Sequence, residues 1–143
     1  MPRPSTTAIA DMLELLARIL HARGYQHGMF PAQWTALRYF SRTRRDLCTA
    51  SELARFQGMA NGPVSRTVRT LVQKGLLAKA KEQPRGKAEI MELTSAGRDL
   101  LKLDPCHEIE TILANLTEEA QSAFKGVLDL LIHKLSLPDT RIA

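Results

Sequence analysis

The polar residues with the clearest capacity for recognition lie on one short stretch near the middle of the chain. Positions three and four apart are neighbours on a helix surface, so a small set here shares one helical face. Arginine can form two parallel hydrogen bonds with guanine, and serine or threonine can bond bases or phosphates. A plain solvated helix face is the alternative interpretation. The set consists of Ser65, Arg66, Arg69 and Thr70.

A second pair of cations, Arg85 and Lys87, follows in the stretch Gln-Pro-Arg-Gly-Lys at 83–87. Proline and glycine favour a tight turn, so both cations are expected at the tip of a hairpin. A basic hairpin tip beside a helix suits the narrow minor groove of DNA or the flanking phosphates. A charged loop tip without a partner is the alternative.

Other groups that could do chemistry lack suitable neighbours. No Ser-His-Asp set, glycine-rich phosphate loop or paired-carboxylate site is evident, so we expect no enzyme and no catalytic residue. Asp104, Glu108 and Glu110 are interpreted as a solvated helix face. We expect no metal and no cofactor, because the histidines lack metal-ligand spacing. These histidines are His21, His27, His107 and His133.

The two cysteines, Cys48 and Cys106, are too few for a disulfide framework. We interpret them as small buried residues, with oxidant sensing as the alternative. No apolar run approaches the length of about 20 residues that a membrane-spanning helix needs. These features favour a reducing cytoplasm, and no membrane partner is expected.

The composition bounds the fold. The chain has 143 residues, of which 44% are apolar and only 5% aromatic, which predicts one domain with a Leu- and Ala-rich helical core. Charge is unevenly distributed: residues 63–103 hold nine Lys or Arg against four acids, whereas residues 104–143 hold three against seven. A basic centre followed by an acidic segment indicates two separate roles on one chain.

Two helices and a hairpin are expected to position the basic residues. Thr49 and Glu52 form a capping box that opens a helix ending near Gly58. A second helix opens at 61–63, where Asn61 or Gly62 caps and Pro63 occupies the first turn, and it ends at Gly75. Alternating residues at 76–81 and 89–93 then predict two strands. The order helix, turn, helix, hairpin is typical of a winged helix-turn-helix.

The ends of the chain predict apolar helices. A wide apolar stripe at helical spacing runs over 6–23, and a further helix begins near Pro31. Toward the C-terminus, Thr94 is expected to cap a helix, Pro105 to interrupt it, and Thr117 to cap a last helix that ends before Pro138. Such stripes can face a core or a second subunit.

The stretch from about residue 31 to 97 resembles the MarR family of bacterial transcription regulators. The flanking helices match in length and place only. The motifs that carry the resemblance are PAQWTALRY at 31–39, SELA at 51–54, VSRTV at 64–68, LVQKGLL at 71–77, RGK at 85–87, and Leu93-Thr94 with Gly97.

The resemblance implies one mainly helical MarR-like domain over 1–143, with a winged helix-turn-helix at about 31–97 and dimerisation helices at about 5–25 and 104–136. It also implies a homodimer on a pseudo-palindromic operator of double-stranded DNA, with half-sites about 34–36 Å apart. The protein is then a ligand- or stress-responsive repressor. A dimeric winged-helix scaffold that does not bind DNA is the alternative.

The resemblance further places His21, Trp34 and Arg38 at a cleft where relatives bind small aromatic acids or phenols. Ordinary core packing of Trp34 is the alternative. The sequence departs from the family in the hairpin: Gln83 stands where relatives carry an acid that helps to hold the wing, and Glu82 is the neighbouring substitute. Lys87 stands where arginine is commoner, which keeps the charge but loses the planar fork.

Overall fold

The structure, a computed structural model, describes residues 2–86 and 88–136. The chain divides into two compact units, Met1–Pro105 and Cys106–Ala143. Among the described residues, no helix is long and apolar enough to cross a bilayer.

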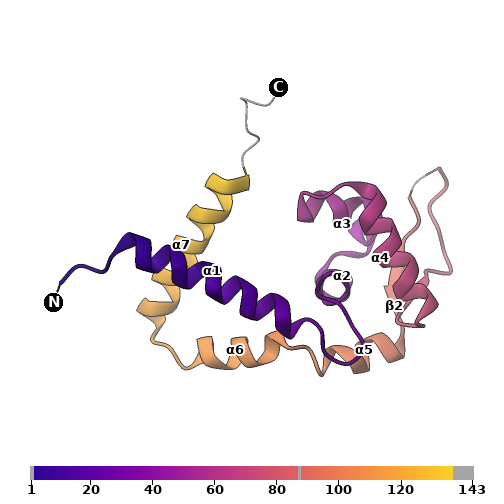
Figure 1. Ribbon diagram of the computed structural model, residues 1–143. Helices are drawn as coiled ribbons and strands as arrows, with labels where there is room; N and C mark the ends of the chain where they lie inside the picture. Colours follow the sequence, from indigo (N-terminus) through magenta and orange to yellow (C-terminus); the bar gives the residue numbers. More distant parts are fainter. Residues whose placement is uncertain (1, 87, 137–143) are drawn as a thin grey trace. The chain divides into compact units, whose positions relative to one another are not determined.

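The first unit is a winged helix-turn-helix, as the sequence predicted, and the fold is mainly helical with one small hairpin. Helices α2, α3 and α4 gather together, and the hairpin loop extends away from them (Figure 1). The elements in chain order are α1 (Thr6–Arg23), α2 (Pro31–Arg42), a 3-10 turn η1 (Arg45–Leu47), α3 (Ala50–Gln57), α4 (Asn61–Gln73), β1 (Leu77–Lys79), β2 (Met91–Leu93) and α5 (Ser95–Leu101).

Local capping sets the helix ends much as expected. The Thr49 hydroxyl accepts a hydrogen bond from the Glu52 amide at 3.1 Å, and Gly58 ends α3 with a left-handed φ of 63°. The start of α4 differs from the prediction. Its N-cap is Ala60, whose extended backbone makes no side-chain cap bond, so Asn61 already lies inside the helix.

The hairpin is antiparallel, and Leu77 pairs with Leu93 while Lys79 pairs with Met91. Each strand has three residues, so both are shorter than the alternation predicted. One further backbone bond, from the Ala80 amide to the Ile90 carbonyl at 2.9 Å, continues the ladder toward the loop.

The core of this unit lies where α2, α3, α4 and β1 meet. Large side chains from all four elements are fully buried, and burial of apolar surface is the dominant favourable term in folding. This packing fixes α4 and the base of the hairpin against one another. The fully buried side chains are Trp34, Leu37, Leu53, Leu71 and Leu77.

Helix α1 has the predicted bounds, yet it buries no residue in this chain. Its large apolar side chains are exposed, including Ile9 at 53% and Met12 at 69%. The apolar stripe of α1 is therefore not covered by the rest of its own unit.

The second unit contains α6 (Cys106–Ala114) and α7 (Glu118–Ser136), and neither helix has a buried residue. The Thr117 hydroxyl accepts from the Ala120 amide at 3.1 Å, which is the predicted cap of α7. The predicted helix end before Pro138 lies outside the described residues.

Candidate nucleic-acid interface

The outer face of α4 carries the residues that the sequence singled out. Val64, Val68 and Leu71 are buried and hold the helix to the core. On the other side, the side chains of Arg66 and Arg69 are exposed, while Ser65 and Thr70 are half-buried. Within residues 2–86 and 88–136, neither arginine makes a hydrogen bond or ion pair, so both guanidinium groups are available to a ligand.

The C-terminal end of α4 is anchored by Lys74, a contact the sequence did not reveal. Its ammonium donates to the Gly28 carbonyl at 2.9 Å and to the Gln33 side-chain oxygen at 3.2 Å. It also lies 6.0 Å from the centre of the Phe30 ring. The loop before α2 is thereby tied to the helix that presents the arginines.

The hairpin loop is held by Gln83. Its side-chain amide donates to the Ala80 and Ile90 carbonyls, both at 2.8 Å, and accepts from the Ile90 amide at 2.7 Å. Glu82, the alternative from the sequence, is exposed and makes no such bond among the described residues. The neutral residue therefore connects the two sides of the hairpin.

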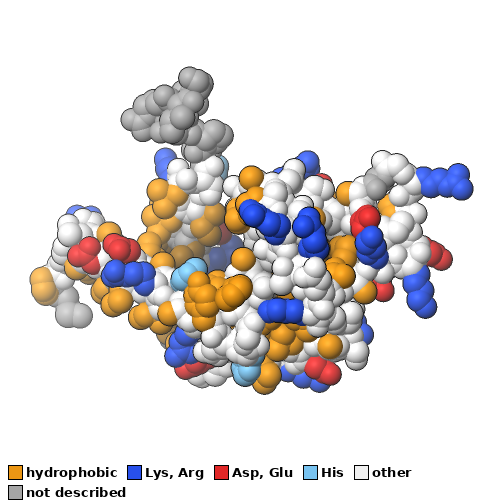
Figure 2. All heavy atoms as spheres, turned by 45° about the vertical axis from the view of Figure 1, so that its right-hand side comes forward, with side chains coloured by type: hydrophobic (Ala, Val, Ile, Leu, Met, Phe, Trp, Pro, Cys, Tyr) orange, Lys and Arg blue, Asp and Glu red, His pale blue; other side chains and the backbone are white. Residues whose placement is uncertain are grey.

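At the loop tip, Arg85 is exposed and has no hydrogen bond or ion pair within the described part of the chain. Gly86 follows with a left-handed φ of 69°, which a glycine adopts without steric cost. Lys87 lies outside the described residues. Basic side chains are spread over the side of the molecule that carries α3, α4 and the hairpin, including its projecting loop (Figure 2).

Several other cations near this face are engaged within the chain. Arg44 pairs with Asp46 at 2.7 Å, Arg45 with Glu92 at 3.5 Å and Lys79 with Glu89 at 3.3 Å. The Asp46 carboxylate raises the pKa of the Arg44 guanidinium. Exposed pairs of this kind contribute little to stability. Their positive charges are nevertheless partly neutralised, which leaves Arg66, Arg69 and Arg85 as the more available contacts.

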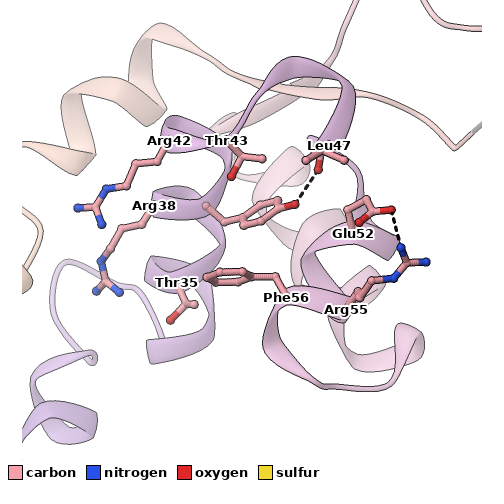
Figure 3. Close-up of a pocket in the computed structure, with 9 residues that line it drawn as sticks. Thr35, Arg38, Arg42, Thr43, Leu47, Glu52, Arg55 and Phe56 are labelled. Atoms are coloured by element: carbon pink, nitrogen blue, oxygen red, sulfur yellow. Dashed lines mark hydrogen bonds and ion pairs between the residues drawn. The ribbon is translucent and has the colours of Figure 1, made fainter. Parts of the chain in front are cut away.

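A pocket of about 640 Å³ lies between α2 and α3 (Figure 3). Arg38 and Arg42 extend side by side at one rim, and Phe56 reaches from α3 toward Thr35. The centroids of the Tyr39 and Phe56 rings are 5.2 Å apart. The Tyr39 hydroxyl donates to the Leu47 carbonyl at 2.8 Å, and burial raises the pKa of this phenol.

The three residues expected at a ligand cleft lie in different places. Arg38 lines the pocket between α2 and α3, whereas Trp34 is fully buried in the core. The Trp34 indole nitrogen has no hydrogen-bond partner among the described residues. His21 is exposed on α1, where its ring nitrogen lies 3.4 Å from the Tyr25 hydroxyl.

Asp104 corrects the sequence interpretation of a solvated acid. The residue is only 4% exposed, and its two oxygens accept from Arg38 at 2.6 and 3.1 Å. No signal in the sequence marks this pair, because 66 residues separate its members.

The Cys48 thiol is buried beside the Thr43 and Arg44 carbonyls, and burial raises its pKa. A raised pKa keeps the thiol protonated and weakly reactive. The interpretation as a small buried residue is thus supported for Cys48, whereas Cys106 is half-buried. Among the described residues, no group of three or more His, Cys, Asp or Glu could hold a metal ion.

Residues 27–88 match the model of the MarR family, and this segment contains α2, α3, α4 and β1, whereas β2 follows it. The resemblance noted from the sequence motifs is confirmed, and the family is one of transcription regulators. No curated protein sequence matches the chain.

Solved structures with the MarR fold superimpose over nearly the whole chain. A Staphylococcus aureus MepR–DNA complex has a TM-score of 0.70 at 20% identity, covering 92% of this chain and 96% of its own. A probable transcriptional regulator from Pseudomonas aeruginosa has a TM-score of 0.64 at 27% identity, covering 90% and 97%. A MarR/EmrR family regulator from Acinetobacter sp. ADP1 has a TM-score of 0.69 at 19% identity, covering 90% and 95%.

Proposed function

We propose that this protein is a sequence-specific regulator of transcription that binds double-stranded DNA. The observation that carries the proposal is the outer face of α4, where Arg66 and Arg69 are exposed and have no partner within the described residues. The B-DNA major groove, about 12 Å wide, admits one such helix. Ser65 and Thr70 flank the two arginines and can bond bases or phosphates.

The hairpin supplies the second DNA contact in this proposal. Arg85 projects at the tip and Lys87 follows it in the sequence, so both suit the minor groove or the flanking phosphates. The solved MepR–DNA complex supports DNA binding in general, because a chain of the same fold is found there with DNA.

We also propose that the regulator acts as a homodimer on a pseudo-palindromic operator. Support comes from the exposed apolar side chains of α1 and from α6 and α7, which bury no residue in their own unit. A two-fold dimer presents two copies of α4 to half-sites about 34–36 Å apart. Binding within a promoter then excludes polymerase, which makes the protein a repressor.

The DNA contacts can be tested by binding titrations on a duplex selected from a random-sequence library with the wild-type protein. Arg66→Ala should cost about 1–3 kcal/mol and relax the preference at one base position. Lys87→Ala should weaken binding to all sequences more uniformly, because a phosphate contact carries no base information. Both variants behaving as wild type would contradict the assigned contacts.

Salt distinguishes DNA binding from the alternative of a dimeric scaffold. A protein that neutralises several phosphates releases counterions, so its affinity falls steeply as salt rises. We expect such a slope for this protein. Absence of any affinity for duplex DNA at about 50 mM salt would favour the scaffold.

We propose that the pocket between α2 and α3 takes a small aromatic or phenolic acid as effector. The Tyr39 and Phe56 rings offer a stacking surface, and Arg38 and Arg42 line the rim, where the charge of Arg38 is already shared with the Asp104 carboxylate. Of the three residues that the resemblance placed at a ligand cleft, Arg38 lines this pocket, whereas His21 and Trp34 do not.

Thermal shift with a panel of phenolic acids tests the effector site. A ligand that binds the folded state raises the melting temperature through mass action. We expect at least one compound to do so for the wild type and not for Phe56→Ala, which removes the exposed ring. No shift with any compound of the panel would contradict the proposal.

A further inference from the structure

Gln83 lies where the backbone ladder of the hairpin stops. The last backbone bond joins the Ala80 amide to the Ile90 carbonyl, and the chain between these two residues forms the loop. The Gln83 side chain then makes three bonds to the same two residues, at 2.7–2.8 Å. Its amide thus acts as an extra rung, with the donors and the acceptor that a peptide group would offer.

This rung requires an amide. The oxygen accepts from the Ile90 amide, and the nitrogen donates to two carbonyl oxygens. A reversed amide would set its NH2 group against the Ile90 N–H. A carboxylate accepts but cannot donate when ionised, so it would face the Ala80 and Ile90 carbonyls without a proton between them.

Arg85 lies two residues beyond Gln83, in the same loop. Its side chain is exposed and makes no hydrogen bond or ion pair within the described residues, so no side-chain interaction there holds Arg85 in place. Fixing the start and the end of the loop reduces the freedom that DNA binding would otherwise have to remove.

We propose that Gln83 is a positioning residue that sets the hairpin tip, and with it Arg85, for DNA contact. The proposal rests on the DNA-binding function proposed above. In this proposal a neutral amide holds the hairpin loop. The affinity for the operator therefore depends on which residue occupies position 83.

The first test reads the rung without DNA. Hydrogen exchange of the Ile90 amide, measured by NMR on the full chain, should be about tenfold faster in Gln83→Ala, because the side-chain acceptor is lost. The matched control is Gln26→Ala, which removes an exposed amide whose side chain makes no hydrogen bond within the described residues. Unchanged Ile90 exchange in Gln83→Ala would overturn the proposal.

The second test measures affinity for the library-selected duplex. Gln83→Ala should lose about tenfold in affinity, comparable to one or two hydrogen bonds. Arg85→Ala should weaken the wild type but have little further effect in the Gln83→Ala background, because coupled residues are non-additive. A full Arg85→Ala effect in that background would show that Gln83 does not position Arg85, and would overturn the proposal.

Gln83→Glu provides a readout that simple loss of structure would not produce. At pH 8 the variant should bind at least as weakly as Gln83→Ala, and its affinity should recover relative to wild type as the pH falls and protonation restores a donor. The groove beside residue 83 also holds the charged groups Arg45, Asp46, Glu52 and Glu82, so each pH point is referred to wild type. A pH profile parallel to wild type would count against the rung.

Two further outcomes distinguish a failure of the proposed DNA binding from a failure of the positioning role of Gln83 alone. If the wild type binds no duplex while Gln83→Ala still accelerates Ile90 exchange, the DNA-binding function fails and the positioning role fails with it. If the wild type binds and Glu82→Ala, rather than Gln83→Ala, loses affinity, then the acid holds the wing and only the further inference is wrong.

Discussion

Arg38 and Asp104 form a largely buried ion pair. The Asp104 side chain is 1% exposed and the Arg38 side chain 22%, and two hydrogen bonds join them. Desolvating such a carboxylate is costly, and a bidentate guanidinium compensates much of that cost. The pair connects α2 to the residue just before Pro105, at the edge of the first unit.

At this scale we predict that Arg38→Ala lowers the free energy of unfolding by about 2–4 kcal/mol, since it leaves Asp104 buried without its bidentate partner. Urea denaturation at fixed protein concentration measures the change. Arg18→Ala is the control, because Arg18 and Glu14 form an exposed pair 3.8 Å apart, and its effect should be close to zero. Equal effects of the two substitutions would contradict the argument.

Helix α5 packs closely on the start of the hairpin. The Thr94 hydroxyl accepts from the Gly97 amide at 3.0 Å and donates to the Gly75 carbonyl at 2.6 Å, so one side chain caps α5 and ties it to the end of α4. Gly97 is buried against the Leu76 carbonyl, and a Cβ on Gly97 would lie 2.3 Å from that oxygen.

At the scale of the element we therefore predict that Gly97→Ala is destabilising by more than about 2 kcal/mol, because backbone must shift to admit the methyl group. Gly126→Ala in α7 is the matched control. A Cβ there meets nothing within 4 Å, so the higher helix propensity of alanine should leave stability unchanged or slightly raised. The melting temperatures of both variants, compared with wild type, test this prediction. An unchanged melting temperature for Gly97→Ala would contradict the close packing.

At the scale of the whole molecule, the distribution of apolar surface is unusual. The winged-helix core is well covered, whereas α1, α6 and α7 contain no buried residue in their own units. Contiguous exposed apolar patches on soluble proteins commonly mark interaction sites. This distribution supports the proposed homodimer, with the terminal helices of two chains covering one another.

We predict a dimer in solution at micromolar concentration, measured by analytical ultracentrifugation. Ile19→Glu should shift the protein toward monomer, because it places a charge in the apolar stripe of α1, where Ile19 is 44% exposed. Arg18→Glu, a change on the polar side of the same helix, should leave the dimer intact. A wild-type monomer would remove the basis for a pseudo-palindromic operator.

Much of this fold was predictable because the signals are local. The bounds of α1, the Thr49 and Thr117 caps and the glycine that ends α3 follow from side chains acting within one helical turn. The exposed face of α4 followed from its apolar periodicity, since a helix with one buried face must present the other.

Tertiary structure decided the contacts between distant residues. The sequence left two places open for Trp34, a ligand cleft shared with His21 and Arg38 or ordinary core packing, and folding buries Trp34 in the core while His21 is exposed on α1. Asp104 reads as a solvated acid until folding brings it to Arg38, 66 positions away. Likewise Gln83 reads as the loss of an acid, and only the geometry of the hairpin shows an amide among two carbonyls and an N–H group. Periodicity and capping are properties of neighbouring residues, whereas these partners are determined by how the elements pack.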